Sequence, residues 1–303
     1  DLADFYSQIG RLDDARRSLE QAQLLEPEEL DLILRLIDLD AKEGHFDDAR
    51  VRYTAELDGA KTPRDLARIH SRLTNLAVMT GRGDDLIEAL GAFRAATAQF
   101  QSPLQADIAH TMMLPAVAEV GRPGEALRLL EAVTANIPQP YDTLSGLGRA
   151  WALSRLGRTD EARDALQEAR ATVDTFKFET FRPSLALVEG LIAEADGNIE
   201  AAAALFEVAS ETAVQVDPMF PMFLAKARNS LGNFDGALEV ITETIASQPA
   251  HPLLHLESAR AHHGKGDIAK AQESLATALK GWEGADEAFP PLIEARALDH
   301  AIK

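Results

Sequence analysis

Four histidines near the C-terminal end are the residues whose types and spacing come closest to a metal site. They are His251, His255, His262 and His263. The separations between His251 and His255, and between His255 and His262, allow two imidazoles to share one helix face, as ligation of Zn²⁺ requires. The same residues are as readily explained as solvated positions at the start and on the surface of a helix. We therefore expect no metal site.

A glycine-containing segment also has the form of a cofactor motif. Residues 264–269, with the sequence GKGDIA, fit a loose dinucleotide-binding fingerprint. The segment follows an expected helix rather than a strand, however, and Gly266 also belongs to a repeated turn. The sequence shows no nucleophile elbow, no phosphate-binding P-loop and no zinc-binding helix with paired histidines. We therefore expect no catalytic residues, no cofactor and no enzyme activity.

A basic segment is a better candidate for binding chemistry. Residues 61–75 carry four basic side chains and one acidic one, a local charge of 4 − 1 = +3 in a chain of formal net charge −19. Arg68 and Arg72 lie one helical turn apart, with Asn75 close by. Such an arginine pair can hold a carboxylate by forked hydrogen bonds. The segment therefore predicts a site for an acidic group of a partner.

A pattern of small and apolar residues recurs along the whole chain and must position these side chains. The turn glycines, which recur at nearly regular intervals, are Gly10, Gly44, Gly81, Gly121, Gly157, Gly197, Gly232 and Gly266. Five positions after each glycine stand Ala15, Ala49, Leu86, Ala126, Ala162, Ala202, Ala237 and Ala271. Four positions further on stand Leu19, Tyr53, Leu90, Leu130, Leu166, Phe206, Ile241 and Leu275.

Each position in this pattern has a physical explanation. The glycine ends one helix in a left-handed conformation that a Cβ atom disfavours. Acids such as Asp47 and Asp84 suit the start of the next helix and its dipole. The alanine lets two antiparallel helices approach closely, and a larger side chain there costs about 1–3 kcal/mol. The apolar residue one turn later fills the space between the helices.

The pattern resembles the bacterial type of tetratricopeptide repeat, a helix-turn-helix unit of about 34 residues. A proline often closes the second helix in that family, and Pro27, Pro138 and Pro249 each fall at the same distance after a turn glycine. The resemblance implies an all-α protein, a right-handed superhelical solenoid of about eight helix-turn-helix repeats with a C-terminal capping helix. The layout that we expect for this single solenoid of residues 1–303 is a truncated first repeat at 1–27, repeats two to eight at 28–283 and a capping helix at 284–303.

Irregular features are expected in the middle of the array. The wider glycine spacings there predict extended helices or loops around residues 93–105 and 174–183. Pro115 falls inside the first helix of the fourth repeat, where it removes one backbone hydrogen bond and should kink the helix.

The two ends of the chain suggest a larger context. Residues 281–297 resemble the ends of repeat regions attached to bacterial serine/threonine kinases, and the chain begins with Asp1 rather than methionine. We expect a piece of a longer protein, with an effector domain covalently attached on the N-terminal side.

The first helix of every repeat lines the concave face in this architecture. Counting back from the turn glycines, the candidate partner-binding residues are Arg35, Arg68, Arg72, Asn75, Trp151 and Phe223. The arginines either hold a carboxylate or pair with acidic neighbours such as Asp31 and Asp38. The two aromatic residues either face the groove, as in adaptable interfaces, or belong to the core.

These features together predict a protein-interaction scaffold or adaptor that binds a peptide or protein partner in its concave groove. The alternative is a peptide- or ligand-responsive sensor domain of a larger bacterial signalling protein. The acidic charge argues against nucleic acid, which requires clustered basic residues. No apolar run approaches the roughly 18 residues of a membrane helix, so no membrane insertion is expected. The expected location is the cytoplasm, with the periplasm left open.

Overall fold

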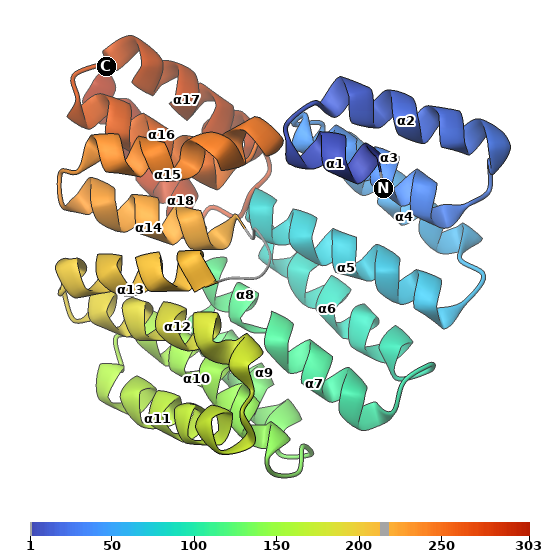
Figure 1. Ribbon diagram of the computed structural model, residues 1–303, viewed down its shortest axis with the longest axis horizontal. Coiled ribbons are helices and arrows are strands. Elements are labelled where there is room, and N and C mark those ends of the chain that lie inside the picture. The colour runs from blue at the N-terminus through green and yellow to red at the C-terminus, as the bar shows by residue number, and fades with distance from the viewer. Residues whose placement is uncertain (1, 213–217) are drawn as a thin grey trace.

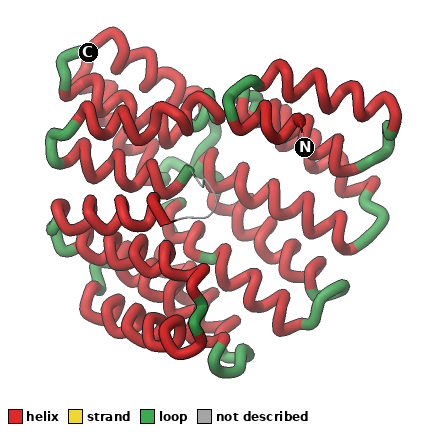
Figure 2. The backbone as a smooth tube through the Cα atoms, viewed as in Figure 1, coloured by secondary structure: helices red, strands yellow, loops and turns green. Residues whose placement is uncertain are grey.

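The computed structural model describes residues 2–212 and 218–303. Within these ranges the regular secondary structure is helical throughout (Figure 2). The elements in chain order are α1 (Leu2–Gln8), α2 (Leu12–Leu25), α3 (Leu30–Lys42), α4 (Phe46–Gly59), α5 (Pro63–Thr80), α6 (Gly83–Thr97), α7 (Pro103–Met113), α8 (Pro115–Glu119), α9 (Pro123–Thr134), η1 (Tyr141–Thr143), α10 (Leu144–Arg155), α11 (Thr159–Phe176), η2 (Glu179–Phe181), α12 (Arg182–Ala195), α13 (Ile199–Thr212), α14 (Met219–Ser230), α15 (Phe234–Ser247), α16 (Pro252–Gly264), α17 (Ile268–Gly281) and α18 (Pro290–Ile302).

The helices pair across the predicted turn glycines, from α1 and α2 to α16 and α17. All eight of these glycines have positive φ angles, between 70° and 90°. The residues five positions after them are all fully buried. The pairs stack into a right-handed superhelix, and α18 packs on α16 and α17 as a capping helix (Figure 1). The predicted all-α solenoid is therefore confirmed.

Helix α5 is a first helix whose start is fixed by local sequence. The Thr62 hydroxyl accepts a hydrogen bond from the backbone N–H of Asp65 at 3.2 Å, and the Asp65 carboxylate accepts one from the backbone N–H of Thr62 at 3.0 Å. Pro63 occupies the first turn, where its missing N–H costs nothing. This capping box sets the register of α5 and so places its groove-facing residues.

The first helix of the fourth repeat is broken, as its proline predicts. Helix α7 ends at Met113 and α8 begins at Pro115, with the buried Leu114 between them. The extra residues of the long repeats lie where expected: α6 continues to Thr97 before a connection, and α11 continues to Phe176 before η2. The repeat therefore tolerates insertions at the ends of its second helices without losing the pairing.

The superhelix completes a turn that brings its two ends together. Helices α1 to α4 lie beside α15 to α17 (Figure 1), and the backbone N–H of Ala250 donates a hydrogen bond to the carbonyl of Lys42 at 3.2 Å. At Gly10 the approach is so close that a Cβ atom would lie 2.3 Å from the carbonyl oxygen of Ala246. Some turn glycines therefore serve contacts between distant repeats as well as their own turn.

Residues 282–289, between α17 and α18, form a clasp that returns to the third repeat. The indole N–H of Trp282 donates to the carbonyl of Met79 at 3.1 Å. The backbone N–H of Asp286 donates to the carbonyl of Gly81 at 2.9 Å. The clasp therefore joins the end of the array to the turn of a repeat in its first half.

An ion pair and an aromatic ring complete the clasp. The Arg122 guanidinium donates to the Asp286 carboxylate at 2.7 Å, which ties the clasp to the fourth repeat as well. Phe289 is buried against Gly81, where a Cβ atom would lie 2.4 Å from the ring. The Phe289 ring also meets the Trp282 ring edge-on, with 5.6 Å between centroids. Packing and polar contacts together hold the superhelix closed.

Replacing Phe289 with alanine should destabilise the protein because it empties the centre of the clasp. We expect Phe289→Ala to lower the free energy of unfolding by about 3–5 kcal/mol, the usual cost of a buried phenylalanine. Urea denaturation followed by circular dichroism measures this. Ile293→Ala, at an exposed position of α18, is the control and should change stability by about 0.5 kcal/mol or less. Equal effects of the two variants would show that the clasp contributes little.

Candidate functional site

A groove of about 1620 Å³ runs through the inside of the superhelix. Its lining comes mainly from the first helices of the repeats, with α18 closing one end. Many lining residues lie nine or six positions before a turn glycine, one helical turn apart on the inner face. In the second, third and seventh repeats these are Arg35, Asp38, Arg72, Asn75, Phe223 and Lys226.

The two groove-lining arginines of the N-terminal half are paired with carboxylates. Arg35 lies 2.7 Å from Asp4, and the Nε atom of Arg72 lies 3.2 Å from Asp38. Asn75 also lines the groove, with an exposed side chain. The sequence left open whether the arginines are available to a partner's carboxylate or pair with acidic neighbours. In the structure both arginines pair with acidic neighbours.

Arg68 has a different place. It forms an ion pair with Asp31 of α3, one helical turn before Arg35. The lining of the groove in α5 starts at Arg72, one turn further along the helix. The predicted pair of Arg68 and Arg72 is thus divided between two carboxylates rather than aimed at one point.

Trp151 and Phe223 line the groove but are buried, so of the two alternatives left open by the sequence they have the core position. Their exposed fractions are 7% and 2%, and their ring centroids lie 6.0 Å apart at 67°. Phe206 stacks on Phe223 at 5.6 Å from the other side. The rings are buried because α10, α13 and α14 enclose them, so they form the floor of the groove rather than projecting into it.

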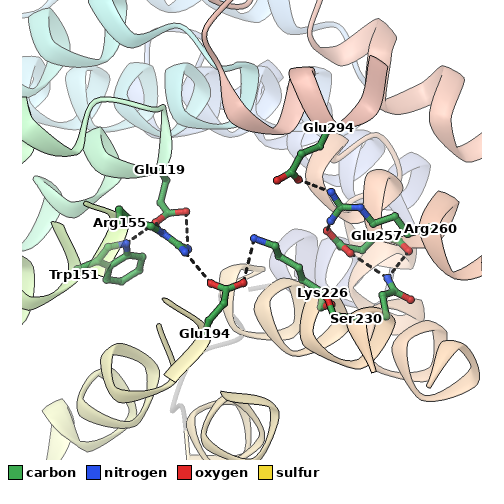
Figure 3. A network of polar contacts seen from close by, with 10 residues as sticks. Glu119, Trp151, Arg155, Glu194, Lys226, Ser230, Glu257, Arg260 and Glu294 are labelled. Carbon is green, nitrogen blue, oxygen red and sulfur yellow. Dashed lines mark hydrogen bonds and ion pairs between the residues drawn. The ribbon is translucent and has the colours of Figure 1, made fainter. Parts of the chain in front are cut away.

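A ladder of alternating charges, not predicted from the sequence, follows the groove wall above this floor (Figure 3). Its members, from α8, α10, α12, α14, α16 and α18, are Glu119, Arg155, Glu194, Lys226, Glu257, Arg260 and Glu294. Arg155 bridges Glu119 and Glu194, with 2.7 Å between nitrogen and oxygen in each pair. Lys226 lies 3.2 Å from Glu194. The first part of the ladder thus joins four repeats.

The second part of the ladder continues toward the capping helix. Glu257 accepts a hydrogen bond from the Asn229 amide at 3.0 Å and forms an ion pair with Arg260. Arg260 also pairs with Glu294 of α18. The capping helix is therefore connected to the groove wall by charge as well as by packing.

Burial and ion pairing shift the pKa values of the ladder residues in opposite directions. Burial raises the pKa of Glu194, but Lys226 and Arg155 lower it by more, so the net pKa lies below its ordinary value. Burial lowers the pKa of Arg155, yet its carboxylate partners outweigh this and raise it. Burial raises the pKa of Glu257, although Arg260 and the Asn229 amide oppose the shift. The charge of Glu257 is thus less well compensated than that of Glu194.

One signal in the sequence pointed to part of this ladder. Lys226 and Arg260 lie six positions before their turn glycines, as Asn75 does in the third repeat. Glu119 and Arg155 do not follow that count. Their pairing joins residues 36 positions apart and depends on how neighbouring repeats rotate, which no local pattern specifies.

The four C-terminal histidines occupy separate environments. His251 lines the groove, the His255 ring lies 2.7 Å from the carbonyl oxygen of Pro249, and His262 lies near Asp267. Among the described residues, one group able to gather metal-ligating atoms consists of Asp40, Glu43 and His45. Arg16 donates to both carboxylates of that group, at 2.8 and 2.9 Å.

The class of protein follows from this architecture: it is a helical-repeat solenoid with a central groove. The family model of the tetratricopeptide repeat matches residues 112–175 and 224–288, and a second model of the same repeat matches residues 1–29. These matches cover more than half of the chain, and the chain belongs to the tetratricopeptide repeat family. No curated protein matches the chain.

Solved structures with the same fold come from several sources. A signal transduction ATPase with numerous domains and a tetratricopeptide repeat sensor, from Pyrococcus horikoshii, is 14% identical; the match covers 84% of this chain and 41% of that one, with a TM-score of 0.52. A tetratricopeptide repeat protein from Parabacteroides merdae is 13% identical over 97% of this chain and 96% of that one, with a TM-score of 0.46. The Cut9–Hcn1 complex of the APC/C is 17% identical over 97% of this chain and 54% of that one, with a TM-score of 0.49.

The similarity to the ATPase, the one of these three with a TM-score above 0.5, supports the fold alone. This chain spans about half of the length of the Cut9–Hcn1 chain that it matches, and less than half of the ATPase. Among the described residues, no helix has both the length and the apolar character needed to cross a membrane.

Removing Arg155 from the ladder should be costly because Glu119 and Glu194 lose their shared partner. We expect Arg155→Met to lower the free energy of unfolding by about 3 kcal/mol or more, as for other buried ion pairs with one partner removed. Arg163→Met is the control, because Arg163 also bridges two carboxylates but is half exposed; it should cost about 1 kcal/mol or less. Urea denaturation of both variants measures the difference. Equal losses would mean that the ladder behaves as surface pairs.

Buried His110 should make the fold sensitive to acid. Burial, and to a lesser degree Arg94, lowers the pKa of His110 to about 4, whereas the unfolded chain has a histidine pKa of about 6.5. As pH falls from about 6.5 to 4 the unfolded state binds a proton that the folded state does not, so stability is lost over this window. His110→Gln should remove up to about 3 kcal/mol of that loss. Denaturation at pH 7 and pH 4.5 tests this, and an unchanged pH dependence in the variant would contradict it.

Proposed function

We propose that the chain is a protein-interaction scaffold or adaptor, which holds a peptide or a helical segment of a partner protein in its central groove. The observation that carries this proposal is the size of the groove. A helix of about 10–12 Å diameter rises 1.5 Å per residue, so the 1620 Å³ of the groove correspond to about 10–14 helical residues. This is the length of a typical recognition helix or of a shorter extended peptide.

The distribution of residue types supports the same function. Positions that repeat along the chain are explained by the turn and by helix packing. The groove-lining positions differ from repeat to repeat, from Asn75 to Trp151 to Lys226 at one equivalent place. Such a surface presents different side chains along its length, as sequence-selective binding requires. The groove arginines and Asn75 remain candidates for contacts to the partner.

A second candidate function, a sensor domain of a larger signalling protein, is favoured by the clasp. Phe289 lines the groove and also holds the superhelix closed against Gly81. A ligand that binds beside Phe289 would act on the contact between the clasp and the third repeat. In a sensor of this kind, Phe289 would couple ligand binding to the shape of the superhelix.

Selection of peptides from a random display library tests the scaffold function. Peptides selected on the wild-type chain should bind Asn75→Trp at least 10-fold more weakly, because the indole fills the groove at an exposed lining position. Gln21→Trp, at an exposed position on the second helix α2, should bind them as the wild type does. Isothermal titration calorimetry gives the affinities. Peptides that bind both variants equally would place the binding surface outside the groove.

X-ray scattering separates the scaffold from the sensor. A sensor should change its radius of gyration when a selected peptide binds, and Phe289→Ala should abolish the change. A scaffold should keep the same scattering profile with and without the peptide.

A further inference from the structure

We infer that the partner segment is an amphipathic helix with a positively charged polar face, whose apolar face packs on a methionine-lined surface. This inference rests on the proposed binding function and specifies the chemistry of the partner. Three observations support it: the distribution of the methionines, the further apolar lining of the groove and the exposure of the charged groups.

Every methionine of the chain lines the groove. The five residues are Met79, Met112, Met113, Met219 and Met222. They come from three separate repeats, through α5, α7 and α14, so they face the cavity from more than one side. Met112 is exposed, and Met113 and Met219 are half buried. Because methionine side chains are flexible and polarizable, they form adaptable apolar surfaces for helical partners.

The apolar lining continues beyond the methionines. The buried rings of Trp151 and Phe223 lie beneath them, and Phe220, Pro290 and Pro291 also line the cavity. An extended polar peptide would leave this lining without apolar contacts. An amphipathic helix covers it with one face while its opposite face reaches the charged groups of the wall.

At the N-terminal end of the wall the groove is lined by two carboxylates, whose arginine partners are less exposed, and by the half-buried Lys42. In the pair of Asp4 and Arg35 the exposed fractions of the side chains are 54% and 15%, and in the pair of Asp38 and Arg72 they are 36% and 24%. In each of the two pairs the carboxylate is thus the more exposed partner.

In the ion pair at the capping helix the carboxylate is again more exposed than the arginine. Glu294 is 43% exposed, whereas its partner Arg260 is 23% exposed. Glu194 and Glu257, between the two ends, are exceptions, because each is less exposed than its basic partners. The carboxylates that are more exposed than their arginine partners are therefore Asp4 and Asp38 in the N-terminal repeats and Glu294 in the capping helix.

This arrangement selects the charge of the partner. Lysine and arginine side chains on the polar face of the helix complement these carboxylates, whereas an acidic face would be repelled by them. The net charge of −19 acts in the same direction at longer range, because it attracts cationic partners and speeds their association.

Designed peptides test the inference on the full chain. Four peptides of equal length are compared: three amphipathic helices with the same leucine positions and with lysine, glutamine or glutamate on the polar face, and a scrambled lysine peptide. The reporters are the ¹³C-methyl signals of the five methionines, which all line the groove. The lysine helix should shift these signals and saturate, with at least 10-fold higher affinity than the glutamate helix. The difference should shrink as salt is raised.

Two results would overturn the inference while leaving groove binding in place. They are an equal or higher affinity of the glutamate helix, and equal shifts with the scrambled lysine peptide. If no peptide shifts the methionine signals, the inference fails, and the separate display experiment decides whether the groove binds any peptide.

A variant pair assigns the binding to the methionines. The double variant Met112→Gln and Met219→Gln keeps the length of two accessible side chains but makes them polar. It should bind the lysine helix at least 10-fold more weakly, while its circular dichroism spectrum and remaining methionine signals show that it is folded. The matched control is Val208→Thr, at an exposed position of α13, and should bind as the wild type does. Equal affinity of the double variant would show that the methionines are not the docking surface.

Discussion

The close approach of two antiparallel helices at each turn is the constraint on which the rest of the structure depends. A glycine with positive φ reverses the chain, and a fully buried small or apolar residue five positions later lets the helices meet. Because this contact recurs eight times, each pair stacks on the last with a small rotation. The rotation curves the array and leaves the first helices facing inward. The groove is thus a consequence of packing within single repeats.

Closure of the superhelix adds a second level of organisation. The clasp at residues 282–289 returns to Gly81 and Arg122, and the charge ladder ties successive first helices to α18. In an open repeat array each unit contacts its neighbours alone. Here the first and last parts also touch, so the width of the groove is fixed by contacts between distant repeats. A partner in the groove meets a wall whose shape is set by the whole chain.

The sequence predicted what is determined within one repeat. The turn glycines, the buried position after them, the break at Pro115 and the helical cap all depend on local spacing, and the structure contains them. The clasp joins distant parts of the chain through an irregular loop and has no local signature. The ladder joins neighbouring repeats, and the spacing from the turn glycines points only to Lys226 and Arg260 among its members. Trp151 and Phe223 line the groove, but their burial depends on the helices beside them. The ion pairs of Arg35 with Asp4 and of Arg72 with Asp38 likewise depend on how neighbouring repeats stack in the superhelix.

The central claim is that a partner binds inside the superhelix, against the first helices of the repeats. Hydrogen–deuterium exchange of the chain, with and without a display-selected peptide at saturating concentration, tests this most directly. Binding in the groove predicts slower exchange in α5, α10, α14 and α16, with little change in the outer helices α6, α11, α15 and α17. Protection confined to the outer helices would contradict it.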